Sequence, residues 1–287
     1  MRFLICFLFI LPCHALNYKI NKSMTYSSKS IKSGTYNIQI HQWINPKNKK
    51  WAMASHGYLD HCLYLKPILD KLIAKNYNIL CYDLPGHGKS SGAPADIKDF
   101  NEYKSVFNDV LKELPKTSDL LFIGHSTGNV GFTQSLMEQS WQNPFKKIIM
   151  IAPLTRSYMW KAYQWALNKS VIGKVKWVPL LMRNDHPDYK ALVKIDPYRV
   201  KRLPTNWLWQ LSLWFEEINS SYVVKSRKMH VIFGKKDTVV DQEYGRLFYS
   251  KVFPNSTIIN LEESHHMPYY DEEENIKIFD KKLDPLL

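Results

Sequence analysis

Ser126 is the residue of this chain best placed for nucleophilic chemistry. It lies at the centre of Gly124-His125-Ser126-Thr127-Gly128, after four apolar residues that predict a buried strand and before a stretch that predicts a helix. A serine at such a turn has a strained backbone and needs small residues two positions away on either side. The start of the next helix offers N–H groups and partial positive charge to an oxyanion. Because this pattern also arises by chance, the prediction of a nucleophile depends on residues elsewhere.

A serine hydroxyl is activated by a general base that a carboxylate orients, and two later loops can supply both groups. Asp237 follows the apolar run 231–233, and His265 and His266 follow the next strand-like run. A single aspartate in a turn or a single histidine in a loop is common. Their joint occurrence at strand ends, in the order serine, aspartate, histidine, predicts a triad of Ser126, Asp237 and one of the two histidines.

The elements that must position these residues alternate between strand and helix. Apolar or alternating runs predict strands, and longer runs with apolar residues three and four apart predict helices. The predicted strands cover 25–33, 35–44, 51–55, 78–83, 120–123, 147–152, 229–234 and 257–261, and the predicted helices cover 61–75, 97–114, 127–139, 241–252 and 271 onwards. This alternation predicts an α/β fold with a mostly parallel central sheet flanked by helices.

The strand rhythm stops after Pro153 for about seventy residues, a length that exceeds any ordinary connection. Six of the nine tryptophans and eleven Lys or Arg, against five Asp or Glu, lie in 153–222. We therefore predict a core formed by 16–152 and 223–287, with 153–222 inserted as a cap. Its aromatic residues could offer apolar surface to an acyl chain, and we predict that Trp160 and Trp165 bind substrate.

The N-terminus has the layout of an export signal. Met1 and Arg2 precede the apolar run 3–11, and Cys13 and Ala15 approximate the small residues of a cleavage site. We predict that residues 1–15 form a signal peptide and that the protein is exported, to the periplasm or the medium. Two cysteines, Cys62 and Cys81, then remain, and their spacing leaves a disulfide and two free thiols equally open.

Composition narrows the possible ligands. The 287 residues carry 39 Lys or Arg and 26 Asp or Glu, a net charge of +13. These charges are dispersed and accompany no nucleic-acid-binding motif, so we predict no nucleic-acid partner. A basic surface also suits peripheral contact with an anionic membrane. No H-E-x-x-H or C-x-x-C pattern occurs, and we predict neither a metal nor a cofactor.

From about residue 33 to the C-terminus the sequence resembles the α/β-hydrolase superfamily, and within it the branch of monoacylglycerol lipases and lysophospholipase-like enzymes. The motifs that carry the resemblance are Ser55-His56-Gly57, Asp83-Leu84-Pro85-Gly86-His87-Gly88-Lys89-Ser90, Gly124-His125-Ser126-Thr127-Gly128, Gly234-Lys235-Lys236-Asp237 and His266.

The resemblance implies roles for particular residues. Family members usually carry the catalytic histidine five residues before an acidic residue, which favours His266 over His265. It also implies that the backbone N–H groups of Tyr58 and Thr127 form the oxyanion hole. The implied activity is a serine-dependent ester hydrolase that acts through an acyl-enzyme on a small-molecule or single-chain lipid ester, such as a monoacylglycerol or lysophospholipid.

Two other functions fit the same motifs. A peptidase of the proline-iminopeptidase type would need an acidic group to hold the substrate amine, and the basic cap argues against it. A non-catalytic binding protein on the same fold is the other alternative, because a fold alone implies no activity.

Overall fold

The computed structural model describes residues 24–117, 119–168, 177–179, 184, 186–219, 223–224 and 228–287. The predicted signal peptide lies outside the described residues. No helix in the described ranges is long and apolar enough to cross a membrane.

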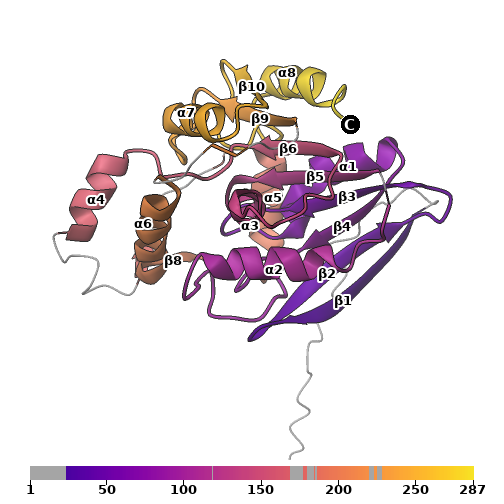
Figure 1. The fold of residues 1–287 in the computed structure, drawn as a ribbon, viewed down its shortest axis with the longest axis horizontal. Helices are drawn as coiled ribbons and strands as arrows, with labels where there is room; N and C mark the ends of the chain where they lie inside the picture. The colour runs from indigo at the N-terminus through magenta and orange to yellow at the C-terminus, as the bar shows by residue number, and fades with distance from the viewer. Residues whose placement is uncertain are drawn as a thin grey trace, which may run out of the picture.

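An eight-stranded sheet forms the centre of the molecule, in the order β1-β2-β4-β3-β5-β6-β9-β10 (Figure 1). Its strands are β1 (Thr25–Ser33), β2 (Tyr36–Ile44), β3 (Lys50–Ser55), β4 (Tyr77–Tyr82), β5 (Leu120–His125), β6 (Lys147–Ile151), β9 (Met229–Gly234) and β10 (Ser256–Leu261). The first two are antiparallel to their neighbours, and the remaining six are parallel to one another. The predicted α/β fold with a mostly parallel sheet is confirmed.

Burial explains which strands occupy the centre. Every residue of β4 and β5 is buried, as their continuous apolar sequences require of strands covered on both faces. By contrast, β1 carries the polar sequence TYSSKSIKS and is exposed along most of its length, so it occupies an edge of the sheet.

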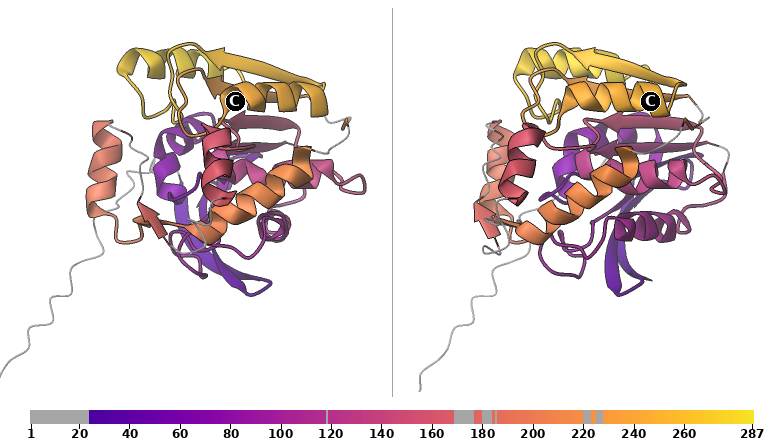
Figure 2. Two further views of the ribbon diagram at one scale, coloured as in Figure 1. Left: turned by 90° about the vertical axis from the view of Figure 1, so that its left-hand side faces the viewer. Right: turned by 60° about the vertical axis from the view of Figure 1, so that its left-hand side comes forward.

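Helices cover the two faces of this sheet (Figures 1 and 2). Their bounds are α1 (Lys66–Ala74), α2 (Asn101–Leu111), α3 (Val130–Met137), α7 (Gln242–Val252) and α8 (Glu273–Leu283), with the short 3₁₀ helices η1 (Cys62–Leu65) and η2 (Ser126–Asn129). On one face, α1 and α8 are joined by an ion pair between Lys71 and Asp280 of 2.8 Å. On the other face α3 lies between α2 and α7.

The segment between β6 and β9 contains α4 (Trp160–Asn168), β7 (Trp177–Pro179), α5 (Pro187–Ile195), β8 (Arg202–Pro204) and α6 (Thr205–Asn219). Of these helices, α4 and α6 lie beyond one end of the central sheet (Figure 1). Trp214 of α6 stacks on Phe100 with the ring centroids 5.1 Å apart. The Trp207 indole N–H donates a hydrogen bond of 2.9 Å to the hydroxyl of Tyr103. Aromatic packing therefore fixes α6 to the body beside α2.

A disulfide joins Cys62 to Cys81, whose Cα atoms lie 6.0 Å apart. The sequence left this pairing open, because only the fold brings the start of η1 against β4. The bond ties the loop that follows β3 to the neighbouring strand, and both cysteines are fully buried.

Candidate active site

Ser126 occupies the turn between β5 and η2. Its φ of +51° lies in the left-handed region that side-chain-bearing residues rarely adopt. Both neighbouring glycines are required by close approach: a Cβ at Gly124 would lie 2.4 Å from the Asn129 amide oxygen, and one at Gly128 would lie 2.4 Å from the Ser55 carbonyl oxygen. The turn is thus packed so tightly that the serine backbone is held in a strained conformation.

Asp237 and His266 meet at the ends of β9 and β10. The His266 Nδ1 lies 2.7 Å from an Asp237 carboxylate oxygen, and Asp237 is buried. The other carboxylate oxygen accepts the backbone N–H groups of Val239 and Val240, which fixes its orientation. When Nδ1–H donates to this carboxylate, Nε2 is left as the acceptor that a general base needs.

His265 lies apart from this pair. Its Nδ1 is 3.1 Å from Asp271, its backbone N–H donates to the same carboxylate at 2.7 Å, and its side chain is 54% exposed. Asp271 therefore anchors the loop through His265, while the next residue turns inward to Asp237.

The segment expected to supply an oxyanion amide lies directly against the serine. A Cβ added at Gly57 would lie 3.3 Å from the Ser126 Cβ. His56 fixes this segment, since its Nδ1–H donates to the Gly57 carbonyl at 2.7 Å and its Nε2 accepts the backbone N–H of Leu84 at 2.9 Å. The next peptide N–H, that of Tyr58, is thereby carried on a hydrogen-bonded loop beside the serine.

Ser126, His266, Tyr58 and Thr127 line one cavity of about 290 Å³. Its wall is largely apolar and combines residues of the body and of the inserted segment. The aliphatic lining residues are Leu59, Leu154, Leu203, Leu208, Leu211, Val239, Val240 and Met267. A largely apolar cavity with a few convergent polar groups is the usual form of a small-molecule site.

Trp160 and Trp165, predicted from the sequence to bind substrate, do not line this cavity. Trp160 is buried against Tyr163 and Phe215, with ring centroids 4.8 and 4.6 Å away, and Trp165 is 63% exposed. The helical period explains this: α4 turns Trp160 and Tyr163 towards α6, and Trp165 falls on the opposite face. Tyr163 lines the cavity instead.

Trp207 is a cavity residue that the sequence analysis did not identify. It stacks on Tyr58 with the ring centroids 3.8 Å apart, and both rings line the cavity. Its helical spacing indicated a buried face, but the sequence carried no signal that this face borders the serine.

Asp60 was also missed. It is buried in the wall of the same cavity and accepts the hydroxyl of Tyr189 at 3.0 Å. Burial raises the pKa of this carboxyl to about 7, although the Tyr189 hydrogen bond and the charges of His61 and Arg199 act in the opposite direction. The signal that could have revealed it is its position in the loop immediately after β3, where the strand ends at the site.

Three further histidines surround the site in neutral form. Burial lowers the pKa of His56 to about 3 and that of His87 to about 4, and it holds the pKa of His125 well below the usual value. His125 also places Nε2 3.0 Å from the His266 carbonyl oxygen, linking the nucleophile turn to the histidine loop. These rings therefore act as neutral hydrogen-bonding supports.

Comparison with known proteins identifies the family of this chain. The sequence profile of the family described as serine aminopeptidase, S33, matches residues 46–273. No curated protein is similar enough to this chain to count as a match.

Several solved structures share the fold at low identity. A monoacylglycerol lipase from Paleococcus ferrophilus is 15% identical, with a TM-score of 0.67 over 91% of this chain and 98% of its own. A soluble variant of the monoglyceride lipase from Saccharomyces cerevisiae, in complex with a substrate analogue, is 14% identical, with a TM-score of 0.73 over 93% and 96%. The esterase Pf2001 from Pyrococcus furiosus is 20% identical, with a TM-score of 0.57 over 92% and 90%.

Proposed function

Because the chain belongs to the serine aminopeptidase S33 family of α/β-hydrolases, we propose that it is a serine-dependent carboxylic ester hydrolase. The observation that carries the proposal is the meeting of Ser126 and the Asp237–His266 pair at one apolar cavity. A base that a carboxylate orients and that shares a cavity with the serine supports general-base activation of that serine.

In the proposed reaction the Ser126 hydroxyl attacks the acyl carbon while His266 takes its proton. Asp237 orients the imidazole and stabilises the imidazolium. The N–H groups of Tyr58 and Thr127 donate to the oxyanion of the tetrahedral intermediate. His266 then protonates the departing alkoxide, and a water molecule, deprotonated by the same ring, hydrolyses the acyl-enzyme.

The substrate that we propose is a single-chain lipid ester, such as a monoacylglycerol or lysophospholipid. The aliphatic wall supports this class, since an acyl chain gains about 0.8 kcal/mol for each buried methylene. Leu208 and Leu211 of α6 and Met267 of the histidine loop supply apolar surface to the cavity from two segments of the chain.

A peptidase of the proline-iminopeptidase type is the second candidate, and one observation favours it. Asp60 places a carboxyl in the cavity wall, where a substrate amine would need an acidic partner. The sequence had indicated no such group in the cap. However, Asp60 is already engaged by Tyr189, and burial favours its neutral form. A binding protein without activity is the third candidate, and the pairing of His266 with Asp237 argues against it.

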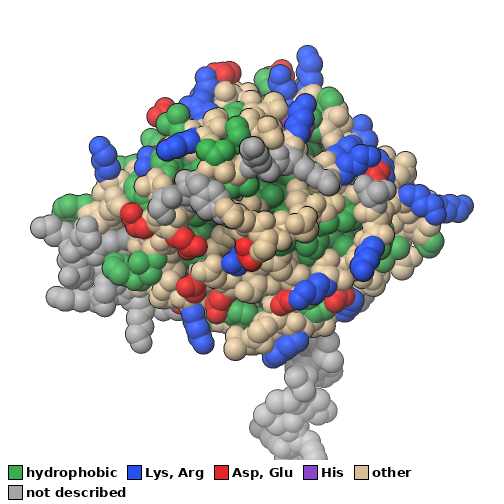
Figure 3. Space-filling view, in the orientation of Figure 1, with side chains coloured by type: hydrophobic (Ala, Val, Ile, Leu, Met, Phe, Trp, Pro, Cys, Tyr) green, Lys and Arg blue, Asp and Glu red, His purple; other side chains and the backbone are tan. Residues whose placement is uncertain are grey.

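We also retain export and peripheral contact with an anionic membrane as proposals. The Cys62–Cys81 disulfide supports an oxidising compartment. On the face drawn in Figure 3, Lys and Arg side chains are scattered among acidic ones. Any attraction to anionic lipid would therefore be diffuse and would weaken as salt is added.

The test is a comparison of hydrolysis rates for p-nitrophenyl esters of graded chain length and for an aminoacyl substrate. We expect medium or long esters to be favoured over acetyl esters, and the aminoacyl compound to react poorly. A preference for the aminoacyl substrate would select the peptidase. Absence of hydrolysis together with absence of fluorophosphonate labelling would select the binding protein.

A further inference from the structure

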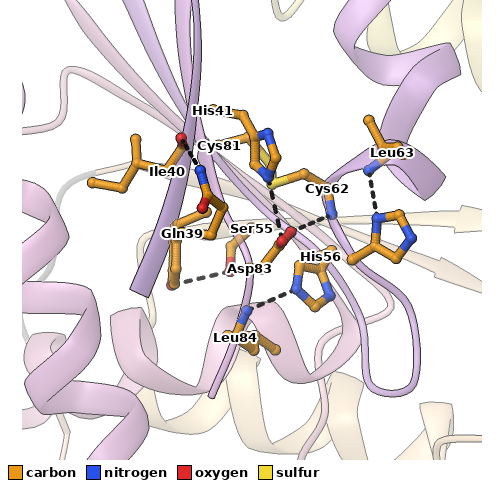
Figure 4. The surroundings of a disulfide bond; sticks show 12 residues. Gln39, Ile40, His41, Ser55, His56, Cys62, Leu63, Cys81, Asp83 and Leu84 are labelled. Carbon is orange, nitrogen blue, oxygen red and sulfur yellow. Dashed lines mark hydrogen bonds and ion pairs between the residues drawn. A yellow bond between two sulfur atoms is a disulfide. The ribbon is translucent and has the colours of Figure 1, made fainter. Parts of the chain in front are cut away.

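Three side chains that are common zinc ligands meet away from the active-site cavity, beneath the loop that follows β3: His41 of β2, Cys62 and Asp83 just past β4. Cys81 reaches this group through its disulfide bond to Cys62, and all four residues are buried. Figure 4 shows the His41 ring and the Asp83 carboxylate pointing towards the disulfide from separate segments. The ligand atoms of His41, Cys62 and Asp83 lie within 4.8 Å of one another, the only such cluster among the described residues.

The spacing of two of these atoms suits a metal. The His41 Nε2 and an Asp83 carboxylate oxygen are 3.3 Å apart, which is long for a charge-assisted hydrogen bond. Two ligands that each lie about 2.0–2.1 Å from a tetrahedral zinc ion are separated by about 3.3–3.4 Å. The imidazole and the carboxylate are therefore already held at the separation that zinc would impose.

The surroundings also supply partners that would orient these ligands. The other ring nitrogen of His41, Nδ1, lies 2.9 Å from the Tyr26 hydroxyl, which could accept an N–H once Nε2 binds a metal. Asp83 accepts the backbone N–H groups of Cys62 and Lys89 at 3.0 and 2.9 Å.

We propose that the reduced protein binds one zinc ion at this place, through Cys62, Cys81, His41 and Asp83. A dithiol or phosphine reductant delivers two electrons and is itself oxidised, the sulfur–sulfur bond breaks, and two protons convert the sulfurs to thiols. Zinc then displaces both thiol protons and binds two thiolates. Because zinc-bound sulfurs lie about 3.8 Å apart, the disulfide and the metal exclude each other.

The proposed site lies beyond the hydrolase activity and shares no residue with the proposed triad. Its structural consequence is that the start of η1 remains tied to β4 in both redox states, by the disulfide when oxidised and by zinc when reduced. The reduced chain without zinc would lack both ties. We therefore expect zinc to raise the melting temperature of the reduced protein and to leave that of the oxidised protein unchanged.

The experiment uses the full chain carrying Cys6→Ser and Cys13→Ser, so that only Cys62 and Cys81 remain. Zinc is titrated against a chromophoric chelator under a phosphine reductant and, separately, after oxidation. We expect about one zinc per reduced chain and none per oxidised chain. Cobalt titrated in place of zinc should give the intense visible bands of a tetrahedral thiolate complex in the reduced chain alone. A reduced chain that binds no zinc would overturn the proposal.

Single substitutions distinguish zinc binding at this site from adventitious zinc binding elsewhere on the protein. His41→Ala should abolish binding, and Tyr26→Phe should weaken it about 10- to 100-fold, the effect of losing a partner that orients a ligand. His230→Ala is the matched control, because it removes a histidine from β9 and should leave zinc affinity unchanged. Equal affinity in His41→Ala and His230→Ala would contradict the assignment.

If reduction alone unfolds the chain, refolding of the reduced protein replaces the titration. Zinc should then increase the yield of folded parent, measured by circular dichroism, and should not do so for His41→Ala. Yields that are equal with and without zinc would contradict the proposal.

Discussion

At the scale of single residues, the site depends on groups held by their neighbours. Asp237 is held by two backbone N–H groups, and Ser126 is held by glycines that allow its turn to pack. Such support is what allows a side chain of ordinary chemistry to act as a nucleophile or a base.

Ser126→Ala should lower ester turnover by about 10³- to 10⁶-fold while leaving the fold intact, because only binding and oxyanion stabilisation survive the loss of a triad member. Fluorophosphonate should label the parent and not this variant, as read by intact-protein mass spectrometry. Ser157→Ala, which removes another cavity-lining serine, is the control and should still be labelled. Labelling of Ser126→Ala would assign the nucleophile to another residue.

Substitutions of the two adjacent histidines should have different effects on activity and stability. His266→Ala should lose nearly all activity, since it removes the ring that contacts Asp237. His265→Ala should keep most of its kcat and lose some thermal stability, because its ring anchors the loop to Asp271. Steady-state kinetics and melting temperature measured together distinguish the two roles, and the reverse pattern of kcat values would transfer the base to His265.

At the scale of elements, α6 presents opposite faces to the cavity and to solvent. Leu211 lines the cavity, and Leu213, two positions later, is 51% exposed. Leu211→Ala should lower kcat/KM for long-chain esters about tenfold relative to acetyl esters, through lost apolar contact. Leu213→Ala, of identical chemistry, should not change this ratio. Similar ratios for the two variants would show that the acyl chain does not occupy this cavity.

The contribution of the disulfide between η1 and β4 to stability can be predicted. The disulfide closes a loop of sequence separation 19, so replacing both cysteines by Ser should lower the free energy of unfolding by about 3 kcal/mol. Urea unfolding in the presence of a chelator measures this without a contribution from metal. An unchanged midpoint would mean that the unfolded chain is not constrained by the bond.

At the scale of the whole molecule, several buried groups make stability depend on pH. His56 and His87 have lowered pKa values in the folded state, so as the pH falls the unfolded state takes up protons before the folded state does. Their contribution to the free energy of unfolding is therefore present above about pH 6.5 and is lost as the pH falls. As the pH falls from 6.5 to 5, each of these histidines should lower the free energy of unfolding by about 1.5 kcal/mol.

Asp60 changes the stability in the opposite direction with pH, and its substitution tests this pH dependence. Its raised pKa means that the folded state holds the proton more tightly, so its contribution is largest below about pH 4 and is lost as the pH rises through about 7. Asp60→Asn should therefore make the loss of stability between pH 7 and 5 steeper than in the parent, as measured by chemical denaturation. A shallower loss in Asp60→Asn would contradict the raised pKa.

The sequence by itself determined the order of the strands of the central sheet along the chain, and it predicted the triad. Ser126, Asp237 and the histidine pair could be located because each follows a strand whose apolar residues are contiguous in the chain. Parallel strands bring their carboxyl ends to one edge of the sheet, so a local pattern was enough to predict proximity.

Only the tertiary structure decided what depends on contacts between distant segments. His266 contacts Asp237, whereas His265 contacts Asp271. The fold also joins Cys62 to Cys81. Asp60 and Trp207 lie in the cavity wall, and Trp160 and Trp165 lie outside it. Helical periodicity predicts that a residue is buried, but not which segment covers it. That is set by how the inserted helices pack on the sheet, and nothing local in the sequence encodes that packing.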